Sequence, residues 1–325
     1  MEWFVGIDVS KATLDVSVLS SRGQAASIHL ANTPGDHRKL LRRVRKAAGD
    51  APVHWCMEAT GPYHWRLALA LVQAGEHVSV ENPRRVKHFA VAIGAVQKTD
   101  RADAKAIARY AQAMRPEAWR LAEPRIRELM FLDRRLSDLA RLCTQEANRL
   151  EHPCLPELVR QGIQASLKEF ERQTQQVEER MAELIEQDPE LSESCRLLQT
   201  IPGIGTRASV TLLAEAGDVA RFQRAEDLAA AFGLHPRLRR SGTSLNGKTR
   251  ISKAGNAHAR CRLYMPAVVG IRVNPILKEF YTKLVLNHKP KKAALIACER
   301  KLVMIAYGVL KSRKPFDPDY GRLKN

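Results

Sequence analysis

The chain has 325 residues, which exceeds one ordinary domain and predicts two or three. It carries 53 lysines and arginines against 35 aspartates and glutamates, a formal net charge of +18. An excess of this size is typical of proteins that bind an anionic polymer, most simply nucleic acid, and a merely soluble basic protein is the alternative. No run approaches the roughly 18 apolar residues that a membrane span needs, so we expect no membrane partner.

The six cysteines are scattered singly along the chain, and no two of them form a CxxC pair. This spacing disfavours a zinc finger and a dithiol redox motif. Isolated thiols fit a reducing compartment, and the N-terminal residues include no apolar stretch long enough for a signal peptide. We therefore expect a soluble, cytoplasmic protein.

Residues 1–120 show short apolar segments that alternate with helical patterns. Strands are predicted at residues 3–9, 14–19, 26–30, 53–58 and 77–80, and helices at residues 34–47, 63–74 and from about 83. Three strands followed by alternating helices and strands predict an α/β domain with a mixed sheet. This order of elements is that of the RuvC-like, or ribonuclease-H-like, fold.

Four carboxylates stand out in this domain. Asp8 interrupts an apolar strand, Glu58 ends another, and Asp100 and Asp103 open a run of good helix formers. Three residues apart, Asp100 and Asp103 lie on one helix face, where like charges repel unless a cation lies between them. A buried carboxylate is also costly unless it is paired or bound to a metal. The four acids together predict a Mg²⁺ or Mn²⁺ site for phosphate-ester chemistry. Each acid also has a simpler alternative. Asp100 could be a helix N-cap and Asp103 a solvated acid. Asp8 could be an acid of an edge strand, and Glu58 an acid in a turn.

Residues 121–191 have the apolar spacing of a coiled coil. Two helices are predicted on either side of a bend that contains Pro153 and Pro156, with apolar residues at alternating three- and four-residue steps. The residues at these steps are Leu129, Leu132, Leu136, Leu139 and Cys143 in the first helix, and Ile163, Leu167, Phe170, Thr174, Val177, Met181 and Leu184 in the second; all but Thr174 are apolar. We interpret the pair as a coiled-coil oligomerisation arm, and the alternative is an intramolecular bundle.

Residues 192–325 predict a mostly α-helical domain that binds nucleic acid. The turn Pro-Gly-Ile-Gly at residues 202–205 resembles the hairpin of helix-hairpin-helix modules, in which Gly203 and Gly205 let the backbone approach a phosphate. A plain turn between helices is the alternative. From Leu228 to Lys278 there is no aspartate or glutamate, which indicates a phosphate-binding surface. Its expected contacts are Arg237, Arg239, Arg240, Lys248, Arg250 and Lys253.

A serine-containing loop lies at the centre of this basic stretch. Ser241 begins the sequence Ser-Gly-Thr-Ser, and a serine in such a loop is most often a turn former. As a nucleophile it needs an electropositive setting, which its arginine and lysine neighbours supply, and a base, which the adjacent sequence lacks. From the residues alone both roles stay open.

Several blocks resemble the DEDD transposases of bacterial insertion sequences, a family that is related to the Piv invertase and includes the bridge-RNA-guided recombinases. In the first domain they are Gly-Ile-Asp-Val-Ser-Lys at residues 6–11, Glu-Ala-Thr-Gly-Pro-Tyr at 58–63 and Lys-Thr-Asp-Arg-Ala-Asp-Ala at 98–104. In the second they are Ser-Gly-Thr-Ser at 241–244 and Arg-Ile-Ser-Lys-Ala-Gly at 250–255. The resemblance covers nearly the whole chain.

This resemblance implies an insertion-sequence transposase that recombines donor and target DNA at specific sites. It implies a metal-binding tetrad of Asp8, Glu58, Asp100 and Asp103. Ser241 would be the nucleophile that joins covalently to a DNA phosphate, with Ser244 as the fallback. The family further implies guidance by a structured bridge RNA, assembly as a homodimer or homotetramer, and association with the bacterial nucleoid. Two other interpretations stay open: a metal-dependent junction-resolving nuclease without serine chemistry, and a non-catalytic nucleic-acid-binding protein.

Overall fold

A computed structural model describes most of the chain. It covers residues 1–23, 25–59, 61–94, 99–241 and 245–319, and between residues 238 and 249 it describes the backbone alone. The chain divides into two compact units, Met1–Leu121 and Ala122–Asn325. Contacts group residues 122–191 with the second unit, and their role as an arm of their own stays a prediction. Among the described residues, no helix is long and apolar enough to cross a membrane.

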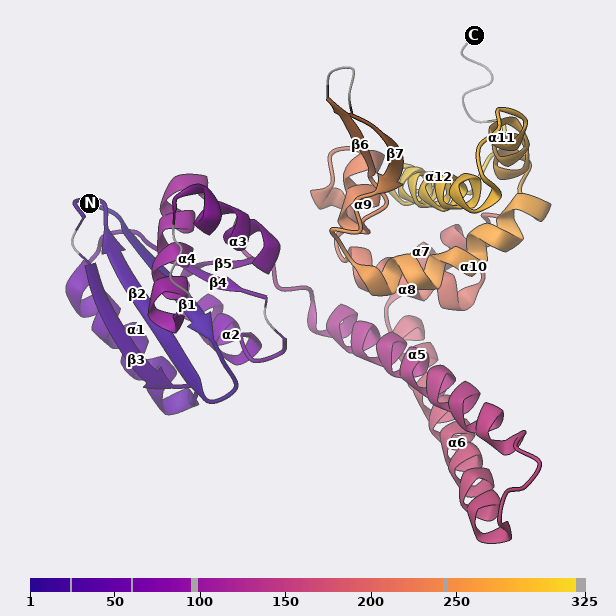
Figure 1. Cartoon of the computed structure of the whole chain (residues 1–325), viewed down its shortest axis with the longest axis horizontal. Coiled ribbons are helices and arrows are strands. Elements are labelled where there is room, and N and C mark those ends of the chain that lie inside the picture. The colour runs from indigo at the N-terminus through magenta and orange to yellow at the C-terminus, as the bar shows by residue number, and fades with distance from the viewer. Residues whose placement is uncertain (24, 60, 95–98, 242–244, 320–325) are drawn as a thin grey trace. The chain divides into compact units, whose positions relative to one another are not determined.

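The first unit contains the mixed sheet that the sequence predicts. Its strands are β1 (Trp3–Val9), β2 (Thr13–Ser20), β3 (Ala25–Ala31), β4 (Val53–Glu58) and β5 (His77–Glu81). Their order across the sheet is β3-β2-β1-β4-β5 (Figure 1). Strand β2 runs antiparallel to β1 and β3, whereas β4 is parallel to β1 and β5. The first three strands form a meander, and the last two are added through helical crossovers.

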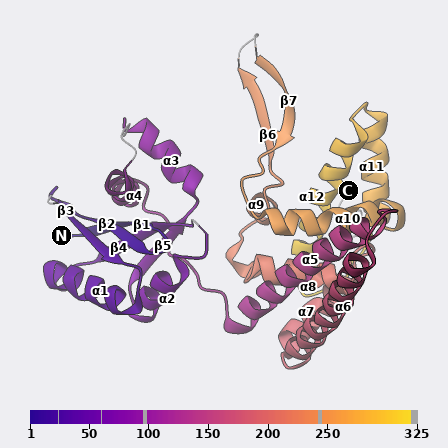
Figure 2. The same cartoon turned by 60° about the horizontal axis from the view of Figure 1, so that its bottom comes forward.

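Helices cover both faces of this sheet. They are α1 (Pro34–Ala48), α2 (Trp65–Gln73), α3 (Pro83–Ala92) and α4 (Asp100–Met114). Figure 2 shows α1 and α2 on one side of the strands and α3 and α4 on the other. Because side chains alternate along a strand, Val5 and Ile7 of β1 join the core with α1 and α2, and Phe4 joins the core with α3 and α4. Asp8 therefore shares the sheet face of Phe4, beneath α4.

The second unit is mostly helical, as expected, and includes one β-hairpin among its described residues. Its elements are α5 (Pro124–Leu150), α6 (Glu157–Glu186), α7 (Pro189–Gln199), α8 (Thr206–Ala216), the 3-10 turn η1 (Val219–Arg221), α9 (Ala225–Ala231), β6 (Pro236–Ser241), β7 (Leu245–Ile251), α10 (Ala257–Val273), α11 (Pro275–Leu286) and α12 (Lys291–Ser312). Strands β6 and β7 pair antiparallel within the acid-free stretch. The sequence patterns did not predict this hairpin.

Helices α5 and α6 pack together as a helical hairpin (Figure 1). Their heptad positions are used within the chain: Leu129, Leu136, Met181 and Leu184 are buried in one apolar core. Burial of a leucine side chain contributes about 1.5–3 kcal/mol, so this seam stabilises the hairpin itself. The intramolecular alternative thus accounts for the spacing, and oligomerisation through this segment stays a prediction.

Candidate active site

A close contact between β1 and α4 sets the geometry of the predicted carboxylate site. At Gly6 a β-carbon would lie 2.2 Å from the Ala108 backbone nitrogen and 2.3 Å from the Ala104 carbonyl oxygen. Such distances exclude any side chain, so glycine alone allows the helix to lie this close to the strand. The contact brings the first turn of α4 beside Asp8, two residues further along β1.

The first turn of α4 carries the other two acids of the site. Thr99 is the N-cap, and its hydroxyl oxygen accepts a hydrogen bond from the Ala102 backbone N–H at 3.2 Å. The alternative of an aspartate N-cap is therefore wrong. Asp100 and Asp103 lie inside the first turn, where the positive end of the helix dipole favours carboxylates.

Asp8, Asp100 and Asp103 converge as the sequence predicts. One carboxylate oxygen from each lies within 4.8 Å of those of the other two. The pKa of Asp8 is raised by burial first, and then by the negative charges of Asp103, Asp100 and Asp15. Ionised acids this close repel one another, and an oxygen-only donor set of this kind fits a hard divalent cation such as Mg²⁺.

Glu58 lies on the neighbouring strand but is not part of this group of three. The last register pair of β1 and β4 is Ile7 with Met57, so Glu58 follows beside Asp8 on the same sheet face. Adjacent strands lie roughly 4.8 Å apart, which keeps Glu58 near the site. Its place in a tetrad stays a prediction.

Two further acids extend the site into a row across the sheet. The register places Asp15 of β2 opposite Asp8, and Glu81 of β5 opposite Glu58. Sequence reasoning missed both residues, although the strand pair at residues 3–9 and 14–19 offered a signal, since its register decides which acids face each other.

Described side chains bind both of these outer acids. Asp15 accepts a hydrogen bond from His29 Nδ1 at 3.0 Å. Glu81 accepts one from the Tyr110 hydroxyl at 3.3 Å and one from Arg85 Nη1 at 3.4 Å. Protein donors thus satisfy Asp15 and Glu81, the acids at the two ends of the row. This distinguishes these two acids from Asp100 and Asp103, which α4 brings to the centre of the row.

A single asparagine ties together the loops that follow β1 and β4. The Asn32 amide donates to the Ser10 carbonyl at 2.9 Å and to the Tyr63 carbonyl at 3.3 Å. Its oxygen accepts from His37 Nε2 at 2.8 Å. Burial lowers the pKa of His37, more than the charge of Asp36 raises it. This network holds the two loops that leave the acid-bearing strands.

In the second unit, the glycine-rich turn connects α7 and α8. Gly203 has φ +103°, and a β-carbon there would lie 2.8 Å from the Gly270 Cα of α10. Gly203 is therefore required for packing inside the protein. Gly205 caps α8 and faces open space. A phosphate contact at either glycine stays a prediction.

The predicted nucleophile lies at the end of β6. Ser241 pairs with Leu245 of β7 across the hairpin. The backbones of Arg239, Arg240 and Lys248 lie in the same two strands, but their side chains and that of Ser241 are outside the described structure. Ser244 lies outside the described residues altogether.

The remaining predicted phosphate contacts flank the base of the hairpin. Arg237 and Arg250 are exposed and face each other across its two strands. Lys253 is exposed just beyond β7 and has φ +54°. Like charges directly opposite destabilise a strand pair, and an anionic ligand would relieve the repulsion between the arginines.

The five-stranded mixed sheet, with acids on β1, β4 and α4, fits the class of DEDD-type, RuvC-like transposase domains. A DEDD transposase model of the IS110 type matches residues 5–158. The model of the Transposase IS116/IS110/IS902 family matches residues 195–282. Together, these two transposase matches cover most of the chain.

Curated relatives agree with these matches. The pilin gene-inverting proteins of Moraxella bovis and Moraxella lacunata are each 30% identical over 315 residues, which is 97% of this chain and 97% of theirs. The transposase for insertion sequence element IS1111A from Coxiella burnetii is 28% identical over 130 residues, 38% of this chain and 35% of its own. The chain belongs to the IS116/IS110/IS902 family of transposases.

Proposed function

We propose that this protein is a site-specific DNA recombinase of an insertion sequence, which cuts and rejoins DNA through a covalent serine–phosphate intermediate. The observation that carries the proposal is the convergence of Asp8, Asp100 and Asp103 within 4.8 Å. The near full-length similarity to proteins named for inverting a gene supports rearrangement of DNA as the outcome.

Asp8, Asp100 and Asp103, with Glu58 from the neighbouring strand, would hold Mg²⁺, and Mn²⁺ fits the same oxygen donors. When bound, the cation supplies charge neutralisation at a phosphate oxygen and at the reacting oxygens. The close contact at Gly6 supports the proposal, because it holds α4 beside β1 and so keeps Asp100 and Asp103 near Asp8. Burial raises the pKa of Asp8 first and the neighbouring negative charges raise it further, and a cation would relieve that repulsion.

Ser241 would act as the nucleophile within an electropositive loop. Its hydroxyl loses a proton as its oxygen forms a bond to phosphorus, the bond from phosphorus to a deoxyribose oxygen breaks, and that oxygen takes up a proton. The serine–phosphate bond keeps the energy of the phosphodiester, so the reverse step joins a new deoxyribose oxygen without ATP. Arg239, Arg240 and Lys248 would stabilise negative charge on the phosphate as it is attacked.

Choice of donor and target DNA would come from base pairing to a structured bridge RNA, and the active assembly would be a homodimer or homotetramer. The support for both statements is the family resemblance together with the net charge of +18, which suits either nucleic acid. Purification of the protein from cells that transcribe the DNA flanking its gene, followed by sequencing of bound RNA, tests guidance. Recovery of random cellular RNA alone would contradict it.

The serine chemistry is tested by trapping the protein–DNA adduct on a nicked substrate. We expect the parent protein to form an adduct with Mg²⁺, and Ser241→Ala and Asp103→Asn to form none. A junction-resolving nuclease would continue to cut DNA as Ser241→Ala, without any adduct. A non-catalytic binding protein would lose nothing with either substitution, and it would bind DNA equally well in EDTA.

A further inference from the structure

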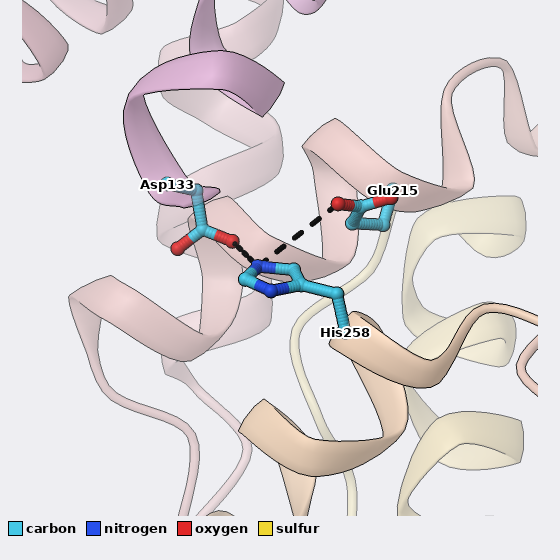
Figure 3. A group of neighbouring side chains, drawn as sticks. All are labelled: Asp133, Glu215 and His258. Carbon is cyan, nitrogen blue, oxygen red and sulfur yellow. Dashed lines mark hydrogen bonds and ion pairs between the residues drawn. The ribbon is translucent and has the colours of Figure 1, made fainter. Parts of the chain in front are cut away.

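A second polar cluster, of two acids and a histidine, lies among the helices of the second unit. Asp133 of α5, Glu215 of α8 and His258 of α10 bring one polar atom each within 4.8 Å of one another. Figure 3 shows the three side chains pointing toward a common centre from three different helices. Asp133 is 1% exposed and the Glu215 side chain 2%, so both carboxylates are removed from water. Such burial requires close compensation of their charge.

Hydrogen-bond donors satisfy Asp133. Nε2 of His258 donates to Oδ2 of Asp133 at 2.8 Å. The hydroxyl of Thr211, on α8, lies 3.1 Å from Oδ1 and 3.0 Å from Oδ2 of the same carboxylate. Because Thr211 is itself fully buried, this pairing joins α5 to α8 in the interior of the unit.

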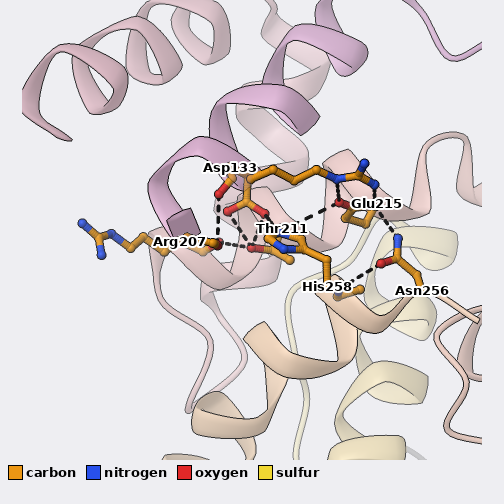
Figure 4. Close-up of polar contacts among 9 residues, drawn as sticks. Asp133, Arg207, Thr211, Glu215, Asn256 and His258 are labelled. Carbon is orange, nitrogen blue, oxygen red and sulfur yellow. Dashed lines mark hydrogen bonds and ion pairs between the residues drawn. The ribbon is translucent and has the colours of Figure 1, made fainter. Parts of the chain in front are cut away.

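A bidentate arginine satisfies Glu215. Nε of Arg134 donates to Oε1 at 2.9 Å, and Nη2 donates to Oε2 at 3.1 Å. The side-chain amide of Asn256 also donates to Oε2 of Glu215, as Figure 4 shows. A guanidinium already supplies the positive charge that a metal ion would bring to this carboxylate, and its N–H groups occupy both oxygens. The cluster is therefore a hydrogen-bonded network and not a metal site.

Asn256 connects this network to the base of the β6–β7 hairpin. It is the N-cap of α10, since its side-chain oxygen accepts from the Ala259 N–H at 3.1 Å. Its own backbone N–H donates to the Ala231 carbonyl at 2.8 Å. One residue earlier, a β-carbon at Gly255 would lie 2.4 Å from that carbonyl oxygen and 2.5 Å from the Gly233 nitrogen. The chain leaving β7 is thus pressed against the chain that enters β6.

Backbone hydrogen bonds continue this contact up to the strands. The N–H of Lys253 donates to the Gly233 carbonyl at 3.1 Å, and the N–H of Ser252 donates to the His235 carbonyl at 2.8 Å. Residues 231–235 and residues 252–256 therefore form one paired base from which both strands of the hairpin emerge. Asn256 is part of this base, and its side chain is hydrogen-bonded to Glu215.

We propose that Asp133, Glu215 and His258 form a clasp that positions the base of the β6–β7 hairpin, and with it Ser241, against helix α5. The three are positioning residues: none of them is assigned contact with DNA. The inference rests on the proposed role of Ser241 as nucleophile. A displacement of a reacting group by about 1 Å can cost on the order of 100-fold in rate, so loosening this base should slow serine attack.

The test compares His258→Leu, which removes the donor to Asp133, with His258→Gln, whose amide restores an N–H near the same place. At saturating DNA and Mg²⁺, we expect His258→Leu to slow adduct formation by about tenfold or more while the Kd for DNA is unchanged. His258→Gln should recover most of the rate. Thr211→Val, which keeps side-chain volume, should slow the reaction as well and replaces His258→Leu if that variant does not fold.

A second measurement does not depend on the serine chemistry. We expect the amides of Ser252, Lys253 and Asn256 to exchange hydrogen faster in His258→Leu than in the parent, and at the parent rate in His258→Gln. Ser241→Ala should leave these exchange rates unchanged. If the parent forms no adduct, the role of Ser241 fails, and the exchange rates still decide whether the clasp exists.

Three results would overturn the inference. The first is an unchanged rate and unchanged exchange in His258→Leu. The second is an equal loss in His258→Leu and His258→Gln, which indicates general damage to the fold. The third is Co²⁺ binding that His258→Leu abolishes and Asp8→Asn preserves, since that would make the cluster a metal site.

Discussion

The two units gather acids in opposite ways. In the second unit, donors from Arg134, Thr211 and His258 reach the buried carboxylates, and the charges are neutralised within the protein. In the first unit, the acids of β1 and α4 lie close together, and burial first and then the negative charges around it raise the pKa of Asp8. The same residue types thus form a satisfied hydrogen-bond network in one unit and, in the other, a group of acids for which we propose a cation. The difference between the two groups is the set of hydrogen-bond donors that reaches the acids.

Substitution of a site carboxylate should give the largest effect. Asp103→Asn keeps the shape of the side chain but removes one anionic ligand, so we expect Mg²⁺-dependent DNA cleavage to fall by roughly 100-fold or more. The matched control is Asp15→Asn, which alters an acid opposite Asp8 that already has His29 as its partner. Cleavage of a labelled substrate measures both. Equal losses in the two variants would remove the distinction between central and outer acids.

The contact that brings the acids together should give the largest effect on stability. Gly6→Ala places a methyl group 2.2 Å from the backbone of α4, and we expect the free energy of unfolding of the first unit to fall by about 3 kcal/mol. Gly162→Ala is the control, because a β-carbon on α6 meets open space and should stabilise the helix by up to about 1 kcal/mol. Urea unfolding measures both variants. A neutral Gly6→Ala would show that α4 can move away from β1 without cost.

A third kind of buried acid sharpens the comparison. Glu299 of α12 is fully buried, and no described group donates a hydrogen bond to either carboxylate oxygen. Burial raises its pKa to about 7 from an ordinary 4.5, although the charge of Arg260 lowers it. The folded protein therefore holds this proton after the unfolded chain has lost it, and stability falls as pH rises through about 7.

Glu299→Gln isolates that effect. The parent should lose about 1 kcal/mol of stability between pH 6 and pH 8 relative to Glu299→Gln, whose amide does not titrate. The measurement is urea unfolding of both proteins at several pH values. Parallel curves would show that the Glu299 carboxyl is ionised throughout, and would require a cationic partner for it in solution.

The sequence predicted what depends on local pattern. The apolar run at residues 3–9 predicted the strand that Asp8 interrupts, and the three-residue spacing predicted that Asp100 and Asp103 share one helix face. It did not reveal Asp15 or Glu81, because their alignment with the site depends on strand register. Nor did it reveal the β6–β7 hairpin: Pro-Arg-Leu-Arg-Arg-Ser at residues 236–241 lacks the apolar alternation of a half-buried strand.

Tertiary contacts explain the other differences. The spacing of the α5 and α6 apolar positions is the same whether a seam binds its own chain or another copy, so sequence could not separate the two outcomes. The polar cluster of the second unit was equally hidden. Asp133, Glu215 and His258 lie far apart along the chain, and only the packing of three helices brings them together.

The smallest expected effect is on nucleic-acid binding, through an exposed arginine of the second unit. Arg237→Gln removes one of two exposed arginines that face each other across β6 and β7, and should weaken nucleic-acid binding modestly while reducing the salt slope of log K by about one. Arg141→Gln is the control, because Arg141 of α5 is already paired with Asp138 and should leave the slope unchanged. Titrations at several salt concentrations measure both slopes. If Arg141→Gln changed the slope as much as Arg237→Gln, binding would follow net charge, and the hairpin would lose its proposed role in phosphate binding.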